Sequence, residues 1–189
     1  PLAELGAICR AHRALLHTDA VQAAGWLALN VDALQVDMLT LAAHKFYGPK
    51  GVGALFVRQR NNRVKIKPII HGGGHEKGLR SGTLNVYGIV GLGSACYFAL
   101  NEMNENIEKI VALKYHLEQS ILKIDGTSIN GSVSKRLYTT SNILIKDVDS
   151  DALILGLSNP VGGGPEIAVS NGSACTSQSF FPSHVLSAM

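Results

Sequence analysis

The feature that most constrains the fold is a series of short apolar segments near the start of the chain. Each has the length of a strand, and turn or helix-forming residues separate them. The segments are 14–19, 38–42 and 52–57. Short apolar strands that alternate with helices, the first of these at 1–12, predict an α/β fold. We therefore expect part of a mostly parallel sheet covered by helices.

The second half of the chain predicts two helices followed by a smaller mixed region. Residues 86–100 are small and apolar, and residues 101–124 have apolar side chains at every third or fourth position. A domain boundary between these helices divides the chain into 1–100, part of a large domain, and 101–189, part of a small C-terminal α+β domain. Further expected elements are strands at 142–145 and 166–170, a helix at 151–157 opened by Asp149 or Ser150, and a helix after Pro182.

Composition excludes several classes of protein. With 46% hydrophobic and 16% charged residues, the 189-residue chain has the composition of a globular protein. Its net charge of +3 is too small to indicate nucleic-acid binding, and no segment is apolar enough to cross a membrane. The three widely spaced cysteines do not form a disulfide framework, which indicates a reducing compartment. Cys9 and Cys96 fall on apolar helix faces, where we expect inert core residues.

Two charged side chains stand where predicted strands end. Asp19 closes the first strand, and Lys45 follows the second. In open parallel sheets ligands bind just beyond the carboxyl ends of the strands, so both side chains are expected to face one crevice. A lysine there can bind an aldehyde cofactor covalently, and an aspartate can hold a ring nitrogen protonated. The spacing alone leaves open an ordinary salt bridge or two solvated strand ends.

Four sequence blocks resemble those of a known enzyme family. They are His17–Gln22, Ala43–Gly51, Gly72–Thr83 and Ser170–Ser177. The first three resemble the cysteine desulfurases, which are class V aminotransferase-like enzymes of fold type I. The fourth resembles the catalytic cysteine loop of the NifS/IscS-like group. Because the blocks occur in order over nearly the whole chain, the resemblance is specific.

The resemblance implies a site for pyridoxal 5'-phosphate (PLP) in the large domain. Lys45 would bind the cofactor covalently and move the substrate's α-proton. Asp19 would pair with the ring nitrogen, Gln22 with the phenolic oxygen and His44 with the phosphate. Thr83 would reach the phosphate bound by a neighbouring subunit, which implies a homodimer.

The resemblance also implies the reaction. Cys175 would attack the sulfur of L-cysteine, giving L-alanine and a persulfide on the enzyme. The acceptor would be an iron–sulfur scaffold protein or a carrier for tRNA thiolation. We expect a cytoplasmic protein (mitochondrial matrix if eukaryotic), with no direct contact to nucleic acid or membrane.

Each assignment has an ordinary structural alternative. His44 could be a core or surface histidine, Gln22 a helix cap and Thr83 a turn residue. His71 and His75 could suggest a metal, but no carboxylate or cysteine has matching spacing, so we predict none. For the whole chain, the alternatives are a related class V PLP aminotransferase, a selenocysteine lyase, or a non-catalytic fragment that binds partners.

The sequence departs from the family pattern in three places. Ala42 stands where the family has a serine that donates to the phosphate, and Thr40 should point to the other face of the strand. Residues 159–165 form an unusual glycine-rich stretch. From the resemblance we also expect the chain to be truncated at both ends. Four family features have no counterpart here: the remaining phosphate ligands, the ring-stacking histidine, an asparagine near the substrate and the carboxylate-binding arginine.

Overall fold

The computed structural model divides the chain into two compact units, Pro1–Lys109 and Ile110–Met189. It describes residues 1–59, 64–172 and 183–188. The division falls nine residues beyond the domain boundary that the sequence predicts at 100, and that assignment of large and small domains stays a prediction. Across the described residues, no helix is both long and apolar enough to span a membrane.

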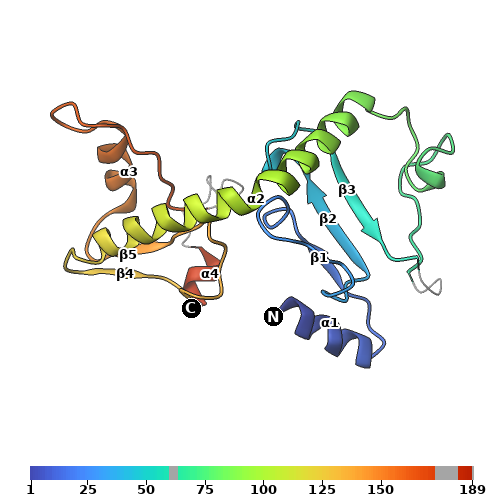
Figure 1. Ribbon diagram of the computed structural model, residues 1–189, viewed down its shortest axis with the longest axis horizontal. Coiled ribbons are helices and arrows are strands. Elements are labelled where there is room, and N and C mark those ends of the chain that lie inside the picture. Colours follow the sequence, from blue (N-terminus) through green and yellow to red (C-terminus); the bar gives the residue numbers. More distant parts are fainter. Residues whose placement is uncertain (60–63, 173–182, 189) are drawn as a thin grey trace. The chain divides into compact units, whose positions relative to one another are not determined.

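The first unit contains a three-stranded sheet in the order β1-β2-β3. The strands are β1 (His17–Asp19), β2 (Met38–Ala42) and β3 (Gly53–Val57). β1 and β2 run parallel, with Asp19 opposite Thr40, whereas β2 and β3 run antiparallel (Figure 1). The expected parallel pairing is therefore confirmed for β1 and β2. β3 reverses direction because a short connection through the turn at 48–51 joins it to β2.

Two small apolar clusters hold this sheet in place. In the first cluster Ala20, Val36 and Leu39 are buried together, and Leu2 of helix α1 (Leu2–Ala11) packs against them. The second cluster joins the turns after β1 and β2 to helix α2: Ala24, Phe46 and Ala95 are buried in contact. The second cluster fixes the segments that follow the two strand ends.

Helix α2 (Val86–Ile121) is continuous, so the prediction of two helices meeting at residue 100 is wrong. The side chains change there from uniformly apolar to amphipathic. However, no proline or glycine occurs between Gly93 and Gly126 to end the helix. The expected burial of Cys96 is also wrong: its residue is exposed on α2, and Cys9 is half-buried.

The second unit contains a two-stranded antiparallel sheet of β4 (Thr127–Ile129) and β5 (Ile143–Ile145). Helix α3 (Ser150–Ser158) begins as predicted, because Asp149 caps it by accepting a hydrogen bond from the Ala152 amide at 2.8 Å. Helix α4 (His184–Ser187) follows Pro182. The predicted strand at 166–170 is wrong: that segment is irregular, and the Ile167 amide donates to the carbonyl of Leu157 in α3.

Candidate active site

The carboxyl end of β1 turns sharply at Asp19. Carboxylate oxygen Oδ1 of Asp19 accepts a hydrogen bond from the Val21 amide at 2.8 Å, and the Ala20 amide donates to the Thr40 carbonyl of β2 at 2.9 Å. An aspartate that accepts from the amide two residues ahead makes a turn of its own. This turn leaves Asp19 exposed at the end of the strand.

Lys45 lies at the carboxyl end of the neighbouring strand. β2 passes directly into a single 3-10 turn, η1 (Ala43–Lys45). Ala43 is buried at its start, where its amide donates to the Val52 carbonyl at 3.1 Å and its own carbonyl accepts from Gly48 at 2.9 Å. Within this turn Lys45 is half-buried and His44 is exposed. The sequence predicted Asp19 and Lys45 where two neighbouring strands end; in the structure Asp19 is the last residue of β1, and Lys45 lies three residues beyond the end of β2, its parallel partner.

The other two predicted cofactor residues lie in exposed connections of the same unit. Gln22 is in the turn after β1, and Thr83 lies between the 3-10 turn η3 (Glu76–Gly78) and α2. The loop before Thr83 is fixed by Ser81, which is buried and donates to the Gly73 carbonyl at 2.7 Å. Among the described residues, no hydrogen bond joins Gln22 or Thr83 to the strand-end residues, so their roles stay predictions.

Thr40 and Ala42 are two residues apart in β2, so their side chains lie on the same face of the strand, and the expectation that Thr40 points to the other face is wrong. The Oγ1 atom of Thr40 forms a hydrogen bond with Nε2 of His17 at 2.7 Å, so that hydroxyl is already engaged. Ala42 is the last residue of β2 and has no polar side-chain atom. Ala42 itself therefore offers no hydroxyl donor to a phosphate bound beyond this strand.

The predicted nucleophile, Cys175, lies outside the described residues. The described part of its block ends at Gly172. Just before it, the Asn171 amide nitrogen Nδ2 donates to Asp151 Oδ1 at 2.6 Å and to Ser150 Oγ at 3.3 Å, at the first turn of α3. Ser170 and Asn171 also line a cavity of about 390 Å³ in the second unit. The described start of this block is thus attached, through Asn171, to the start of α3.

The donor groups at the strand ends fit PLP. The carboxylate of Asp19 uses Oδ1 for its own turn, and its Oδ2 takes part in no hydrogen bond among the described residues. Lys45 offers a primary amine and His44 an imidazole within one turn of β2. A carboxylate for a ring nitrogen and an amine for an aldehyde are the groups that hold this cofactor. Across the described ranges, no cluster of three His, Cys, Asp or Glu could hold a metal ion.

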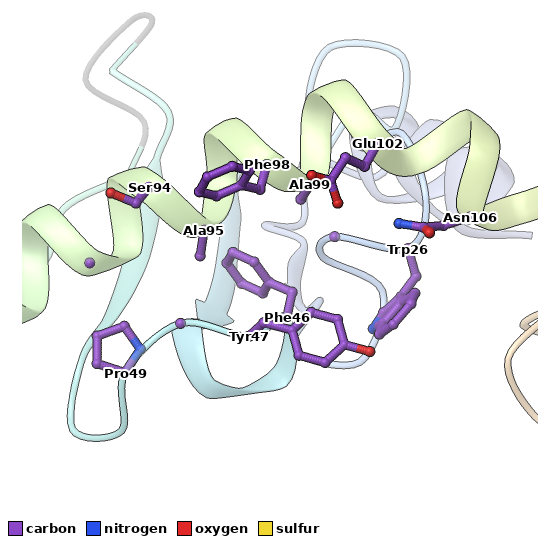
Figure 2. A pocket seen from close by; sticks show the side chains of 13 residues that line it. Trp26, Phe46, Tyr47, Pro49, Ser94, Ala95, Phe98, Ala99, Glu102 and Asn106 are labelled. Carbon is purple, nitrogen blue, oxygen red and sulfur yellow. The ribbon is translucent and has the colours of Figure 1, made fainter.

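Another cavity, of about 460 Å³, lies in the first unit and is lined by Phe46 and Tyr47, which follow Lys45. Figure 2 shows its aromatic lining, with Trp26, Phe46 and Tyr47 on one side and Phe98 of α2 on another. None of the predicted cofactor residues lines it. The sequence analysis assigned no role to Trp26, although its indole Nε1 donates to the Lys45 carbonyl oxygen at 3.3 Å. The signal available in the sequence was that it is the only tryptophan in the chain.

Comparison with known proteins identifies the class. The family model described as "Aminotransferase class-V" matches residues 1–189, so the chain belongs to this PLP-dependent family. The fold class expected from the sequence is confirmed, because the similar solved structures are NifS-like enzymes of PLP fold type I.

Within this family the chain is similar to cysteine desulfurases. It is 46% identical over 188 residues to cysteine desulfurase IscS of Histophilus somni strain 2336, covering 100% of this chain and 45% of the relative. It is 45% identical over 185 residues to the IscS of Haemophilus influenzae strain PittEE, covering 98% and 44%. The resemblance to the NifS/IscS-like group is confirmed. The chain spans about half the length of these relatives.

Two solved structures are similar to this chain. The NifS-like protein from Rickettsia africae matches with a TM-score of 0.81 at 35% identity, over 91% of this chain and 46% of that one. A structure titled "SspA in complex with cysteine" matches with a TM-score of 0.73 at 36% identity, over 100% of this chain and 49% of that one. The second title shows that a protein of this fold binds cysteine.

Proposed function

We propose that the protein carrying this chain is a cysteine desulfurase, which removes sulfur from L-cysteine and leaves it as a persulfide on Cys175. The observation that carries this proposal is the placement of Asp19 at the carboxyl end of β1 and of Lys45 just beyond the carboxyl end of β2, its parallel partner. Identity of 45–46% to curated cysteine desulfurases over nearly the whole chain supports the choice of reaction.

The residues of the first unit bind the cofactor and move the proton. When bound, PLP supplies an electron sink for the carbanion at the substrate's α-carbon. Lys45 would hold the cofactor through its Nζ amine and would take the α-proton of the substrate. Asp19 would keep a proton on the ring nitrogen through its carboxylate, and His44 would donate to the phosphate. The short turns at Asp19 and η1 fix the positions from which these groups act.

Cys175 takes the sulfur. Its thiolate attacks the sulfur of L-cysteine, forming the sulfur–sulfur bond of the persulfide as the carbon–sulfur bond of the substrate breaks. The electron pair of that broken bond stays with the substrate, whose carbon is protonated to give the methyl group of L-alanine. A thiol is required because a persulfide needs a sulfur nucleophile.

The remaining assignments follow from the family resemblance. We propose a homodimer in which Thr83 reaches the phosphate of the neighbouring subunit, with Gln22 bonded to the phenolic oxygen of the ring. The persulfide would pass to an acceptor such as an iron–sulfur scaffold protein. A cytoplasmic location, or the mitochondrial matrix in a eukaryote, agrees with the free thiol that this chemistry needs.

The test uses the full-length natural polypeptide that carries this sequence. It is incubated with PLP, reduced with borohydride, and the modified lysine is identified by peptide mass. We expect one adduct, on Lys45, and equal amounts of alanine and Cys175 persulfide after addition of cysteine. Labelling scattered over exposed lysines such as Lys50 and Lys77, or alanine without persulfide, would overturn the proposal.

A further inference from the structure

A hydrogen bond from the turn after β1 holds the backbone of Lys45. The indole Nε1 of Trp26, in the turn that follows β1, donates to the backbone carbonyl oxygen of Lys45 at 3.3 Å. This contact is partly buried, and it joins two segments nineteen residues apart. It connects the turn that follows β1 with the turn that ends at Lys45.

The turn that carries Trp26 is itself packed tightly. The Ala24 amide donates to the Ala20 carbonyl at 2.8 Å, and the Trp26 amide donates to the Ala23 carbonyl at 3.1 Å. Gly25 has a φ of +80°, and a Cβ at this position would meet the Cβ of Phe46 at 2.4 Å. Only glycine allows this approach, which brings the tryptophan against the residues that follow Lys45.

The indole ring is supported from the other side by Tyr47. The rings of Trp26 and Tyr47 meet edge to face, with centroids 5.8 Å apart and planes at 71° (Figure 2). Phe46, between Lys45 and Tyr47, is buried against Ala24 and Ala95. An aromatic ring held by such packing has few rotamers open to it, so its N–H is directed at the carbonyl before any ligand binds.

We infer that Trp26 is a positioning residue, which holds the Lys45 backbone so that the Lys45 amine is presented to PLP in one orientation. This inference rests on the proposed function, because it takes Lys45 as the residue that binds the cofactor. Trp26 touches neither cofactor nor substrate in this role. It acts through a hydrogen bond to the main chain, which a side chain without an N–H cannot replace.

The test compares Trp26→Phe with Tyr47→Phe in the full-length natural polypeptide. Trp26→Phe keeps an aromatic ring but removes the N–H donor. Tyr47→Phe removes the hydroxyl of the neighbouring ring and leaves the hydrogen bond from Trp26 to Lys45 in place. Apparent PLP affinity is measured by titration, together with the pH midpoint of the visible absorbance of the Lys45 adduct. We expect Trp26→Phe to bind PLP roughly three- to tenfold more weakly, the usual cost of one hydrogen bond, and to shift the pH midpoint. Tyr47→Phe should do neither.

The outcomes separate this inference from the proposed function. If wild type forms no adduct on Lys45, both fail. If wild type forms it and Trp26→Phe matches wild type in affinity and midpoint, or loses only thermal stability, the inference alone is overturned. Should Trp26→Phe not fold, benzothienylalanine at position 26 keeps the shape of tryptophan with sulfur in place of the N–H. The same loss of affinity with this residue supports the inference, and wild-type affinity overturns it.

Discussion

Lys45 and Cys175 are assigned to one reaction, but the segments that lead to them differ. Lys45 follows β2, the central strand of its sheet, and main-chain hydrogen bonds at Ala43 and the indole of Trp26 fix its turn. The approach to Cys175 through residues 161–172 is exposed along its whole length and contains no strand. Its described side-chain attachments are the bonds from Asn171 to the start of α3.

This difference agrees with the two tasks. A residue that holds a cofactor and moves a proton must keep its reacting atom within a few tenths of an ångström, and strand ends give that precision. A residue that takes sulfur and passes it on must meet two different partners, which a loop allows more readily. The predictions below test whether the division between the two segments holds.

The largest effect is expected at Cys175. In the full-length natural polypeptide, Cys175→Ser should abolish alanine formation from cysteine and leave the PLP absorbance unchanged, because the serine hydroxyl cannot take up sulfur. Cys96→Ser is the matched control, since Cys96 is an exposed thiol on α2 with no assigned role. Loss of PLP in Cys175→Ser, or equal loss of activity in Cys96→Ser, would contradict the assignment of cofactor binding and sulfur transfer to separate segments.

A nearly equal effect is expected at Lys45. Lys45→Ala should lose the reducible adduct and lower turnover by about 10²- to 10⁴-fold, which is the usual contribution of a positioned acid–base group. Lys50→Ala, an exposed lysine in the next turn, should keep both. Borohydride trapping and alanine release measure the two effects. A trapped adduct in Lys45→Ala would assign the cofactor to another lysine.

The packing behind Lys45 can be tested through two glycines with nearly the same backbone conformation. Gly25 and Gly51 have φ values of +80° and +81°, but only at Gly25 would a Cβ meet another atom, Phe46 Cβ at 2.4 Å. We expect Gly51→Ala to cost about 1–2 kcal/mol from backbone strain alone. Gly25→Ala should cost about 1–3 kcal/mol more because of the clash. Denaturant unfolding measures both, and equal losses would contradict the close packing of this turn.

The smallest effect concerns the second unit, where Glu118 joins α2 to the segment before β5. Glu118 is buried and accepts hydrogen bonds from Arg136 at 2.7 Å and from Ser141 at 2.6 Å. Glu118→Gln keeps the shape but removes the charge and should cost about 1–3 kcal/mol of unfolding free energy. Glu105→Gln, in an exposed pair with Lys109, is the control and should match wild type.

The contribution of Glu118 to the free energy of unfolding should depend on pH. Burial by itself raises the pKa of Glu118. The hydrogen bonds from Ser141 and Arg136 and the charges of Arg136 and Lys114 lower it by a larger amount, so the net pKa lies below the ordinary value. The charged form therefore stabilises the fold. Its contribution is complete above the unfolded pKa of about 4.3 and is lost as pH falls through the lower folded pKa. A gap between wild type and Glu118→Gln that persists in strong acid would contradict this.

Local signals in the sequence predicted much of the fold. The boundaries of β2 were predicted at both ends, and Asp149 was named among the residues that open α3, because strand periodicity and helix capping depend on neighbouring residues. The irregular segment at 166–170 was missed because a strand needs a partner for its backbone hydrogen bonds, and local sequence does not supply one. β4 was missed for a related reason: it has only three residues, and its partner β5 lies beyond a long connection.

The sequence by itself determined the family to which these blocks belong and the candidate residues of the site: an aspartate and a lysine at the ends of two apolar strands, and a cysteine among small residues. Only the tertiary structure decided how Lys45 is held. Trp26 stands outside the recognised blocks, and its hydrogen bond to Lys45 depends on the turn at Gly25 packing against Phe46. A contact between two turns follows from the pairing of β1 with β2, which no local pattern encodes.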